Sequence, residues 1–357
     1  MADTKIATAT AVEAQIKAIL GAWGMDEPAL STTARVLLWA DLRGIDSHGV
    51  SMIASSYRRM RDAGVLNLQP KLETVVDLPA VATIDGDGGL GHYPSVTAME
   101  LAIAKGRQCG IAAVAVRNSN HYGAAGYYAG MAAEAGLIGI SMTGVHVAAT
   151  VPTFGAEPRF GTNPIAFAAP AGRNRPFLLD MATSTVAIGK LVLASRAGKP
   201  LPAGWALDQA GQPLTDAKRA RETRHLTPLG GTRELGSHKG YGLAMMVDIL
   251  CSTLSGAAYA PARVPFKPGE AYDVGHFFLT MDPGAFRDKA GFLDDLDAMI
   301  DTLHATKRAD PAQPVLVAGD PEAAIEQERR AHGIPLSSVL VDELRDIARA
   351  ANAEFTL

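Results

Sequence analysis

The chain has 357 residues, of which 48% are hydrophobic and 20% charged, and its formal net charge is −4. This composition is that of an ordinary globular protein with one or two domains. A slightly negative balance without a basic run excludes the electrostatic pattern of nucleic-acid-binding proteins. Neither the segment from Met1 to Thr10 nor the uncharged stretch 135–156 predicts a signal peptide or a membrane span, so we expect a cytoplasmic protein.

Helical spacing of apolar residues marks the first part of the chain. One helix is expected over Val12–Leu20 with its end at Gly24, and a second over Pro28–Leu42. A third helix is expected from Val50 to Gly64. The two cysteines, Cys109 and Cys251, have apolar neighbours and are expected to be buried, reduced thiols.

Beyond residue 76 the pattern changes to short apolar strands that alternate with helices and Gly-rich loops, which predicts an α/β layer structure. The expected strands are Val81–Ile84, Ile111–Val116, Leu137–Met142, Ile165–Ala168, Phe177–Leu179 and His276–Met281. A helix is expected over Gly240–Leu254, a loop over Pro261–Gly269, and helices again after 285 with an apolar interruption at Val315–Val317. We therefore predict a helical part over 1–75, an α/β domain over 76–285 and a second helical part over 286–357, which rejoins the first.

Two histidines stand on Gly-flanked turns. His48 follows Ser47 and precedes Gly49, between two expected helices, where a helix N-terminus favours the neutral ring. His121 lies in the run NHYG at 120–123, directly after an expected strand. One such histidine is more often a capping or packing residue, but two similar loops indicate a catalytic site.

A GxGxxG pattern at 86–91 follows an expected strand and precedes a helix, as in a Rossmann dinucleotide site. The next strand ends at Arg117, where such sites carry an acid for the ribose, although an Arg there favours a 2′-phosphate. His92 and Pro94 also crowd the expected helix start. The Rossmann interpretation stays open on these residues alone.

Three later runs place small and polar residues at strand ends or helix starts: GTNP at 161–164, DMATS at 180–184 and SHKGYG at 237–242. Free backbone N–H groups at such ends bind phosphate oxygens. Lys239 at a helix start suggests a nearby anion. The runs are consistent with a phosphate-bearing ligand, and equally with ordinary helix caps. A metal site is not expected, because no histidine pair has helical ligand spacing and no HExxH occurs.

In this order, the runs at 41–49, 120–123, 161–164, 180–183, 238–244 and 275–278 and the tail 319–335 resemble the type-2 malate/L-lactate dehydrogenases. That family includes ureidoglycolate dehydrogenase, sulfolactate dehydrogenase, diketogulonate reductase and the cyclic imino-acid reductases. The resemblance covers nearly the whole chain. It implies a homodimeric oxidoreductase, in which a non-Rossmann sheet domain holds NAD or NADP beside a mostly helical lobe built from both chain ends. NAD is our expectation between the two cofactors.

The resemblance assigns residue roles by position. It implies proton transfer by His48, oriented by Ser47, with His121 as the second candidate and Asn120 fixing its loop. The cofactor contacts that it implies are His146, Gly161, Thr162, Asn163, Asp180, Met181, Ala182, His238, Lys239, Gly319 and Asp320.

One departure concerns the substrate carboxylate. Many members of the family have Arg four residues after the Ser-His-Gly histidine, whereas this chain has Met52. Helical spacing turns Met52 toward the site, unless it packs between helices as core. Arg43, Arg58 and Arg59 are the local cations that can replace the missing Arg, and Tyr122 is a further substrate candidate.

The sequence therefore predicts hydride transfer between NAD(P) and a small 2-hydroxy acid or its 2-oxo acid. Reduction of a cyclic imino acid is the alternative within the family. A metal-dependent hydrolase that uses the histidines, and a regulatory protein that binds a nucleotide without turnover, are the alternatives outside it.

Overall fold

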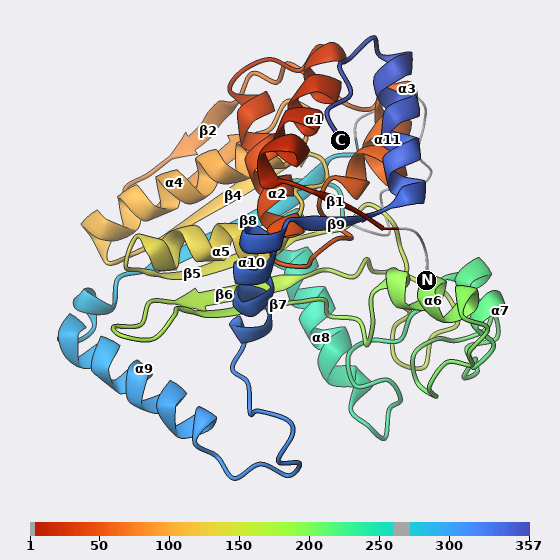
Figure 1. Ribbon diagram of the computed structural model, residues 1–357. Helices are drawn as coiled ribbons and strands as arrows, with labels where there is room; N and C mark the ends of the chain where they lie inside the picture. The colour runs from red at the N-terminus through yellow and green to blue at the C-terminus, as the bar shows by residue number, and fades with distance from the viewer. Residues whose placement is uncertain (1–3, 260–271) are drawn as a thin grey trace.

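A computed structural model describes residues 4–259 and 272–357; the predicted loop 261–269 lies outside the described residues. Helices lie on both sides of a central β-sheet (Figure 1). The helices of the first part are α1 (Ala9–Ala22), α2 (Ala29–Leu42), the π-helix η1 (Ile53–Tyr57) and α3 (Arg58–Asp62). The expected helix over 50–64 is therefore interrupted by a π turn, while α1 and α2 confirm the other two predictions.

The central sheet has seven strands among the described residues, in the order β2-β3-β4-β8-β5-β6-β7. Their bounds are β2 (Glu73–Asp77), β3 (Val81–Asp85), β4 (Ile111–Ser119), β5 (Ile138–Thr143), β6 (Ile165–Ala169), β7 (Phe177–Met181) and β8 (Val274–Met281). Among the strands that the structure describes, only β3 and β4 run parallel, and α4 (His92–Cys109) joins them. The other pairs are antiparallel, and β7 is an edge strand.

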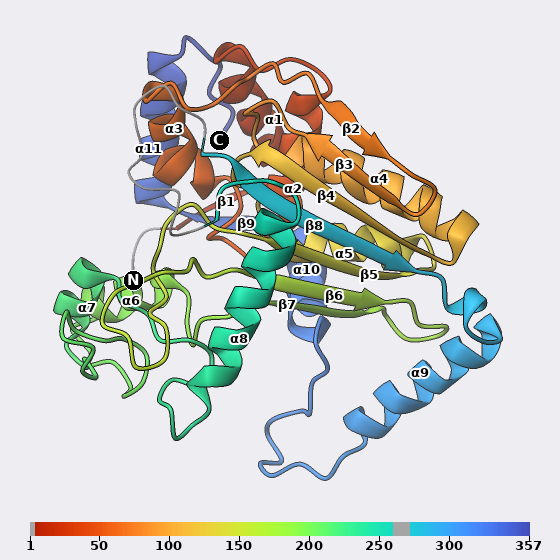
Figure 2. The same cartoon turned by 180° about the vertical axis from the view of Figure 1, so that it is seen from behind.

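Helices cover both faces of the sheet. On one face, α4 and α5 (Ala125–Glu134) bury an apolar layer that includes Val114, Ala166 and Phe278. On the other face lies α8 (Ser237–Asp248), which continues as the π-helix η2 (Ile249–Thr253), and its Val247 packs with Phe277 (Figure 2). This helix begins three residues before the predicted Gly240, so Lys239 lies in its first turn.

Both chain ends contribute to one hydrophobic cluster. Strand β1 (Thr4–Ala7) pairs antiparallel with β9 (Ile334–Ser337), and α11 (Ser338–Ala350) packs beside α1. Ile16, Leu37 and Leu344 are all fully buried there. By contrast, α9 (Lys289–His304) contributes no residue to this cluster and lies apart from it, while α10 (Asp320–His332) crosses beside α2 (Figure 1).

The remaining elements are the short helices α6 (Ile188–Arg196) and α7 (Ala217–Thr223), which enclose a small cluster of their own, and the turn η4 (Pro283–Ala285). Within the described part of the chain, no helix combines the length and apolarity needed to cross a bilayer. Cys251 is buried as predicted, but the prediction for Cys109 is wrong. Cys109 is the last residue of α4 and is exposed there, with its thiol directed at the carbonyl of Pro79.

Candidate active site

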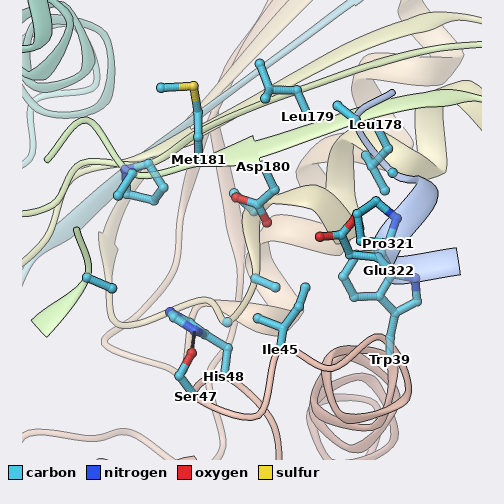
Figure 3. A pocket seen from close by; sticks show the side chains of 18 of the residues that line it. Trp39, Ile45, Ser47, His48, Leu178, Leu179, Asp180, Met181, Pro321 and Glu322 are labelled. Atoms are coloured by element: carbon cyan, nitrogen blue, oxygen red, sulfur yellow. Dashed lines mark hydrogen bonds between the residues drawn. The ribbon is translucent and has the colours of Figure 1, made fainter. Parts of the chain in front are cut away.

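A cavity of about 470 Å³ lies where three distant segments meet: the turn after α2, the end of β7 and the turn before α10. Figure 3 shows His48 and Asp180 facing the same space from opposite walls, with Trp39 and Glu322 on its flank. Seven of the predicted site residues line this cavity: Ser47, His48, Thr162, Asp180, Met181, Ala182 and Gly319. The structure thus brings together residues that are more than 270 positions apart in sequence, such as His48 and Gly319.

A buried carboxylate holds the His48 turn. Asp41, at the end of α2, is 1% exposed and accepts a hydrogen bond from the backbone N–H of Val50 at 2.8 Å. Burial raises the pKa of Asp41 to about 7, against the lowering effect of that hydrogen bond. The same helix end is tied to α10, because Arg329 donates to the carbonyl of Asp41 and pairs with Asp46 at 2.5 Å.

Ser47 and His48 form a pair at the cavity wall. The Ser47 Oγ lies 2.8 Å from His48 Nδ1, so the hydroxyl is hydrogen-bonded to the ring. Burial lowers the pKa of His48, which keeps the imidazole neutral at neutral pH. A neutral ring whose Nδ1 is bonded to a hydroxyl has its Nε2 free to accept or to deliver a proton.

His121 stacks on His48 and is partly exposed beside the cavity, although it is not one of the residues that line it. The two rings are stacked, with centroids 5.5 Å apart and planes inclined by 23°. Burial, followed by repulsion from His48 and His92, holds the pKa of His121 well below its usual value. Asn120 is fully buried, and its amide donates to the carbonyl of Gly88 at 2.8 Å.

Asp180 provides a carboxylate at the opposite wall. Its Oδ2 accepts a hydrogen bond from the N–H of Gly126, in the first turn of α5, at 2.7 Å. Burial raises the pKa of Asp180 to about 6, against the lowering effect of the Gly126 hydrogen bond, and repulsion from Glu322 adds to the rise. Among the described residues that line the cavity, Asp180 and Glu322 are acidic and none is Lys or Arg.

Other predicted cofactor residues lie outside the cavity wall. Asn163 is buried and donates to the carbonyl of Ala244, and a side chain at Gly161 would collide with Val145. His146 stacks on Tyr272 with ring centroids 4.1 Å apart. Asp320 accepts from the N–H of Val317 and pairs with His304, each at 2.7 Å, so its carboxylate stabilises the turn before α10.

His238 and Lys239 are exposed in the first turn of α8, which packs on the sheet face opposite α5. The loop 228–231 connects them to the cavity: Leu229 donates to the carbonyl of Thr183 at 2.8 Å, and Gly240 packs closely against Leu229. Thr183 directly follows the cavity residue Ala182. The start of α8 is therefore linked to the cavity through one loop.

The three substrate candidates occupy other positions. Met52 is 8% exposed and packs in the cluster of the two chain ends, so the placement toward the substrate is corrected to a core position. Arg43 does not line the cavity, because it pairs with Glu326 at 2.7 Å and lies over the ring of Trp39. Tyr122 is buried, bonded to Ser141 and stacked on His276.

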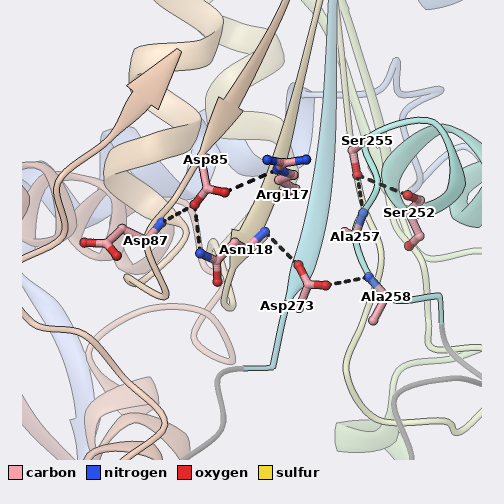
Figure 4. A network of polar contacts seen from close by, with 9 residues as sticks. All are labelled: Asp85, Asp87, Arg117, Asn118, Ser252, Ser255, Ala257, Ala258 and Asp273. Atoms are coloured by element: carbon pink, nitrogen blue, oxygen red, sulfur yellow. Dashed lines mark hydrogen bonds and ion pairs between the residues drawn. The ribbon is translucent and has the colours of Figure 1, made fainter. Parts of the chain in front are cut away.

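The GxGxxG loop at 86–91 supports the His121 loop. Its βαβ context is present, but the N–H groups of Gly86, Gly88 and Gly91 donate to the carbonyls of Arg117, Asn118 and His121, respectively. These amides are therefore engaged by the protein itself and do not form a free phosphate cradle. Arg117 is bound as well, at 3.2 Å from the Asp85 carboxylate in a polar network that also holds Asn118 and Asp273 (Figure 4).

Sequence reasoning missed several wall residues, among them Trp39, Leu178 and Glu322. Trp39 carried only a burial signal in an amphipathic helix. Leu178 belonged to an expected apolar strand, and its exposure to the cavity follows from the edge position of β7. The described residues contain no group of three or more His, Cys, Asp or Glu placed to hold a metal ion.

Comparisons with known proteins identify the family. The model of the malate/L-lactate dehydrogenase family matches residues 7–345. The malate dehydrogenase of Pyrococcus horikoshii is 41% identical over 94% of this chain and 92% of its own, and the L-sulfolactate dehydrogenase of Methanocaldococcus jannaschii is 35% identical over 92% of both chains.

Solved structures agree. The malate dehydrogenase of Entamoeba histolytica superposes with a TM-score of 0.93 at 32% identity, over 99% of both chains. The Δ1-piperideine-2-carboxylate reductase of Pseudomonas syringae superposes with a TM-score of 0.83 at 26% identity, over 96% of this chain and all of the other. The resemblance carried by the sequence motifs is confirmed: the chain belongs to the malate/L-lactate dehydrogenase family.

Proposed function

We propose that this dehydrogenase transfers a hydride between a nicotinamide cofactor and a small 2-hydroxy acid, giving the 2-oxo acid, with His48 as the group that takes or gives the hydroxyl proton. The observation that carries the proposal is the cavity that combines the Ser47–His48 pair with Asp180. Its volume of about 470 Å³ falls in the usual range of small-molecule sites. The nicotinamide supplies the hydride chemistry, and the protein supplies orientation and proton transfer.

We also propose that the cofactor is held without a Rossmann fold. The support is the engaged amides of the 86–91 loop and a sheet with a single parallel pair among its described strands. The cavity instead runs along the edge strand β7, where the backbone has groups that are not paired with a neighbouring strand. Gly319 fits this placement, since it takes a positive φ of 102° at the cavity rim.

In this arrangement, Thr162, Met181, Ala182 and Gly319 would hold the nicotinamide half of the cofactor, and Lys239 at the start of α8 would hold its phosphates. The linking loop 228–231 supports this division, because it joins the two places through hydrogen bonds. The helix N-terminus adds partial positive charge beside Lys239. His146, Gly161, Asn163, His238 and Asp320 then belong to the surrounding frame. The choice between NAD and NADP stays a prediction, with NAD expected.

The substrate carboxylate requires a cation from outside the described cavity wall. Arg43 is engaged with Glu326, and the remaining nearby candidates are Arg58 and Arg59, which are exposed. We propose that the active unit is a homodimer, in which a partner subunit completes the carboxylate site. The observation behind this proposal is an acidic cavity that must accept an anionic substrate.

The test is an oxidation screen with NADH and with NADPH against pyruvate, oxaloacetate and sulfopyruvate. We expect turnover of at least one of these 2-oxo acids. The screen includes Δ1-piperideine-2-carboxylate, because the similarity to a reductase of that compound favours imino-acid reduction as the second candidate. If the enzyme turns over the imino acid alone, the imino acid and not a 2-oxo acid is its substrate. Binding of cofactor without turnover of any compound would contradict both candidates.

A further inference from the structure

A buried hydrogen-bond chain reaches His121 from behind. The hydroxyl of Tyr57 lies 3.0 Å from His121 Nδ1 and 3.3 Å from His92 Nε2, so it bridges the two rings. The backbone N–H of Gly123 also donates to His121 Nδ1, at 3.3 Å. Tyr57 and His92 are both fully buried. The cavity chemistry described above uses neither residue.

One backbone N–H group fixes which atoms donate and which accept along this hydrogen-bond chain. A backbone N–H can only donate, so His121 Nδ1 accepts and the neutral ring carries its proton on Nε2. The Tyr57 hydroxyl must then donate its single proton to the same Nδ1, and its oxygen accepts from His92 Nε2. This leaves His92 Nδ1 without a proton. That atom is indeed buried and has no hydrogen-bond partner within the described structure, as suits a bare acceptor better than a donor.

Local backbone features bring these groups together. Tyr57 closes the π-helix η1, a wider turn than an α-helix and one that recurs at functional sites. His92 is the first residue of α4, placed by the 86–91 loop. Gly123 has a φ of 81°, and a Cβ there would lie 3.1 Å from His92 Nε2 and 3.2 Å from Val36. Only glycine readily gives both this conformation and this clearance.

We propose that Tyr57 and His92 are positioning residues that hold His121 as a neutral ring with its proton on Nε2, so that His121 donates a hydrogen bond to the substrate oxygen and does not act as the base. Proton transfer then falls to His48 alone. The assignment rests on the proposed function for the substrate contact, whereas the tautomer of His121 depends only on the hydrogen bonds above. It also gives a reason for two stacked histidines in one site, since they perform different tasks.

The pKa values along the hydrogen-bond chain agree with separate tasks for His48 and His121. Burial lowers the pKa of His92 to about 3, and burial raises the pKa of Tyr57 well above its usual value. Three groups that all remain neutral between pH 6 and 9 provide a fixed donor. A fixed donor polarises a carbonyl without reorganisation at the moment of reaction.

The first experiment observes the tautomer directly. Nitrogen chemical shifts of ¹⁵N-histidine-labelled enzyme, with the signal assigned by a His121→Gln variant, distinguish a protonated Nε2 from a protonated Nδ1. We expect His121 to carry its proton on Nε2 throughout pH 6–9. A proton on Nδ1, or a titration within this range, would overturn the proposal. This measurement needs no substrate, so it is independent of whether the proposed reaction is right.

The second experiment removes the hydroxyl. Tyr57→Phe should lower kcat about tenfold, the effect of losing one hydrogen bond, with little change in cofactor affinity, and its His121 spectrum should show mixed tautomers. Tyr128→Phe is the matched control, because Tyr128 is equally buried and its hydroxyl donates to the Tyr122 carbonyl. The control should lose stability without either change. Normal kcat and an unchanged His121 spectrum in Tyr57→Phe would overturn the proposal.

The third experiment compares two variants of His92, and it tests the proposal even if Tyr57→Phe does not fold. His92→Gln keeps a donor near the position of Nε2, whereas His92→Leu removes it. We expect His92→Gln to retain the wild-type tautomer and more of kcat than His92→Leu. Equal spectra in the two variants would contradict the positioning role. If no 2-oxo acid is reduced by the wild type, the proposed function fails, and the spectra still decide the tautomer.

Discussion

Gly49 allows a buried carboxylate to approach the turn that carries His48. A Cβ at this position would lie 1.7 Å from Asp41 Oδ1, so any side chain would expel the carboxylate that accepts from Val50. The glycine is therefore required for close approach and not for a positive φ. Its neighbours gain a fixed orientation, which is what a proton-transfer group needs.

His48→Ala tests proton transfer. We expect kcat to fall by about 10²-fold or more, because general acid–base catalysis typically contributes that much, while cofactor affinity stays near wild type. Burial lowers the pKa of His48, so hydroxy-acid oxidation by the wild type should lose activity only as the pH falls below the usual histidine range. Steady-state kinetics from pH 5 to 9 measure both. Turnover near wild type in the variant would exclude His48 from the mechanism.

Met52→Arg tests whether residue 52 belongs to the core. Its side chain is 8% exposed among apolar neighbours, so a buried guanidinium without a partner should lower the melting temperature markedly. Ser55→Arg, at an exposed position of the π-helix η1 that directly follows Met52, is the control and should melt near wild type. Improved kcat/KM for pyruvate or oxaloacetate in Met52→Arg, without loss of stability, would instead place residue 52 in the substrate site.

At the scale of elements, the 86–91 loop does not have the role that its glycine spacing suggests. The loop has the glycine spacing of a phosphate cradle, yet its amides bond to the 117–121 segment. The start of α8 lacks such a fingerprint, yet its first turn presents Lys239 to solvent. Glycine spacing alone does not tell whether the N–H groups of a loop bind a ligand or other parts of the protein, because the hydrogen-bond partners are distant in sequence.

Cofactor titrations of two variants separate these roles. Lys239→Ala should weaken NADH or NADPH binding about tenfold or more, as expected for one charged hydrogen bond. Gly86→Ala should lower the melting temperature, since its Cβ would meet the Asn118 carbonyl at 3.0 Å, without a selective loss of affinity. Lys218→Ala, on the exposed face of α7, serves as the control cation. Loss of binding in Gly86→Ala with normal binding in Lys239→Ala would restore the Rossmann site.

The sequence predicted most elements because their apolar periodicity is local. Helices α1 and α2 and the sheet strands other than β2 lie within a few residues of their expected bounds, and β4 continues past its expected end to Ser119. Strand β2 was not predicted. The π turns in η1 and η2 were not predicted, since apolar spacing hardly differs between π and α turns over one turn. Cys109 was misplaced because apolar neighbours in sequence do not show which side of a helix end meets solvent.

For the site, the motifs predicted Ser47, His48 and Asp180, which line one cavity. They did not predict Tyr57 or His92 as neighbours of His121. Those contacts join residues 64 and 35 positions apart and depend on how η1 meets α4. Neither did they decide between the substrate site and the core for Met52, because the packing partners that bury it come from distant parts of the chain.

At the scale of the whole molecule, the cavity depends on both ends of the chain. Arg329 of α10 binds Asp41 and Asp46 beside the His48 turn, and Arg43 of that turn binds Glu326 of α10. The turn before α10 also joins the sheet, since Leu178 donates to the carbonyl of Ala318 at 3.1 Å. The three walls are thus linked by polar contacts and can respond to a ligand together.

Hydrogen exchange measures that response across the molecule. Saturating NADH or NADPH should slow amide exchange in three separate segments, 45–48, 178–187 and 316–322, because one ligand contacts all three walls and stabilises them jointly. The small cluster around Leu214 and Leu226 lies outside the cavity and should exchange as in the free enzyme. Protection confined to 86–91 and the start of α4 would move the cofactor to the glycine-rich loop. Protection of only one wall would mean that the cavity does not enclose the cofactor, and the assignment of Gly319 to its binding site would fail.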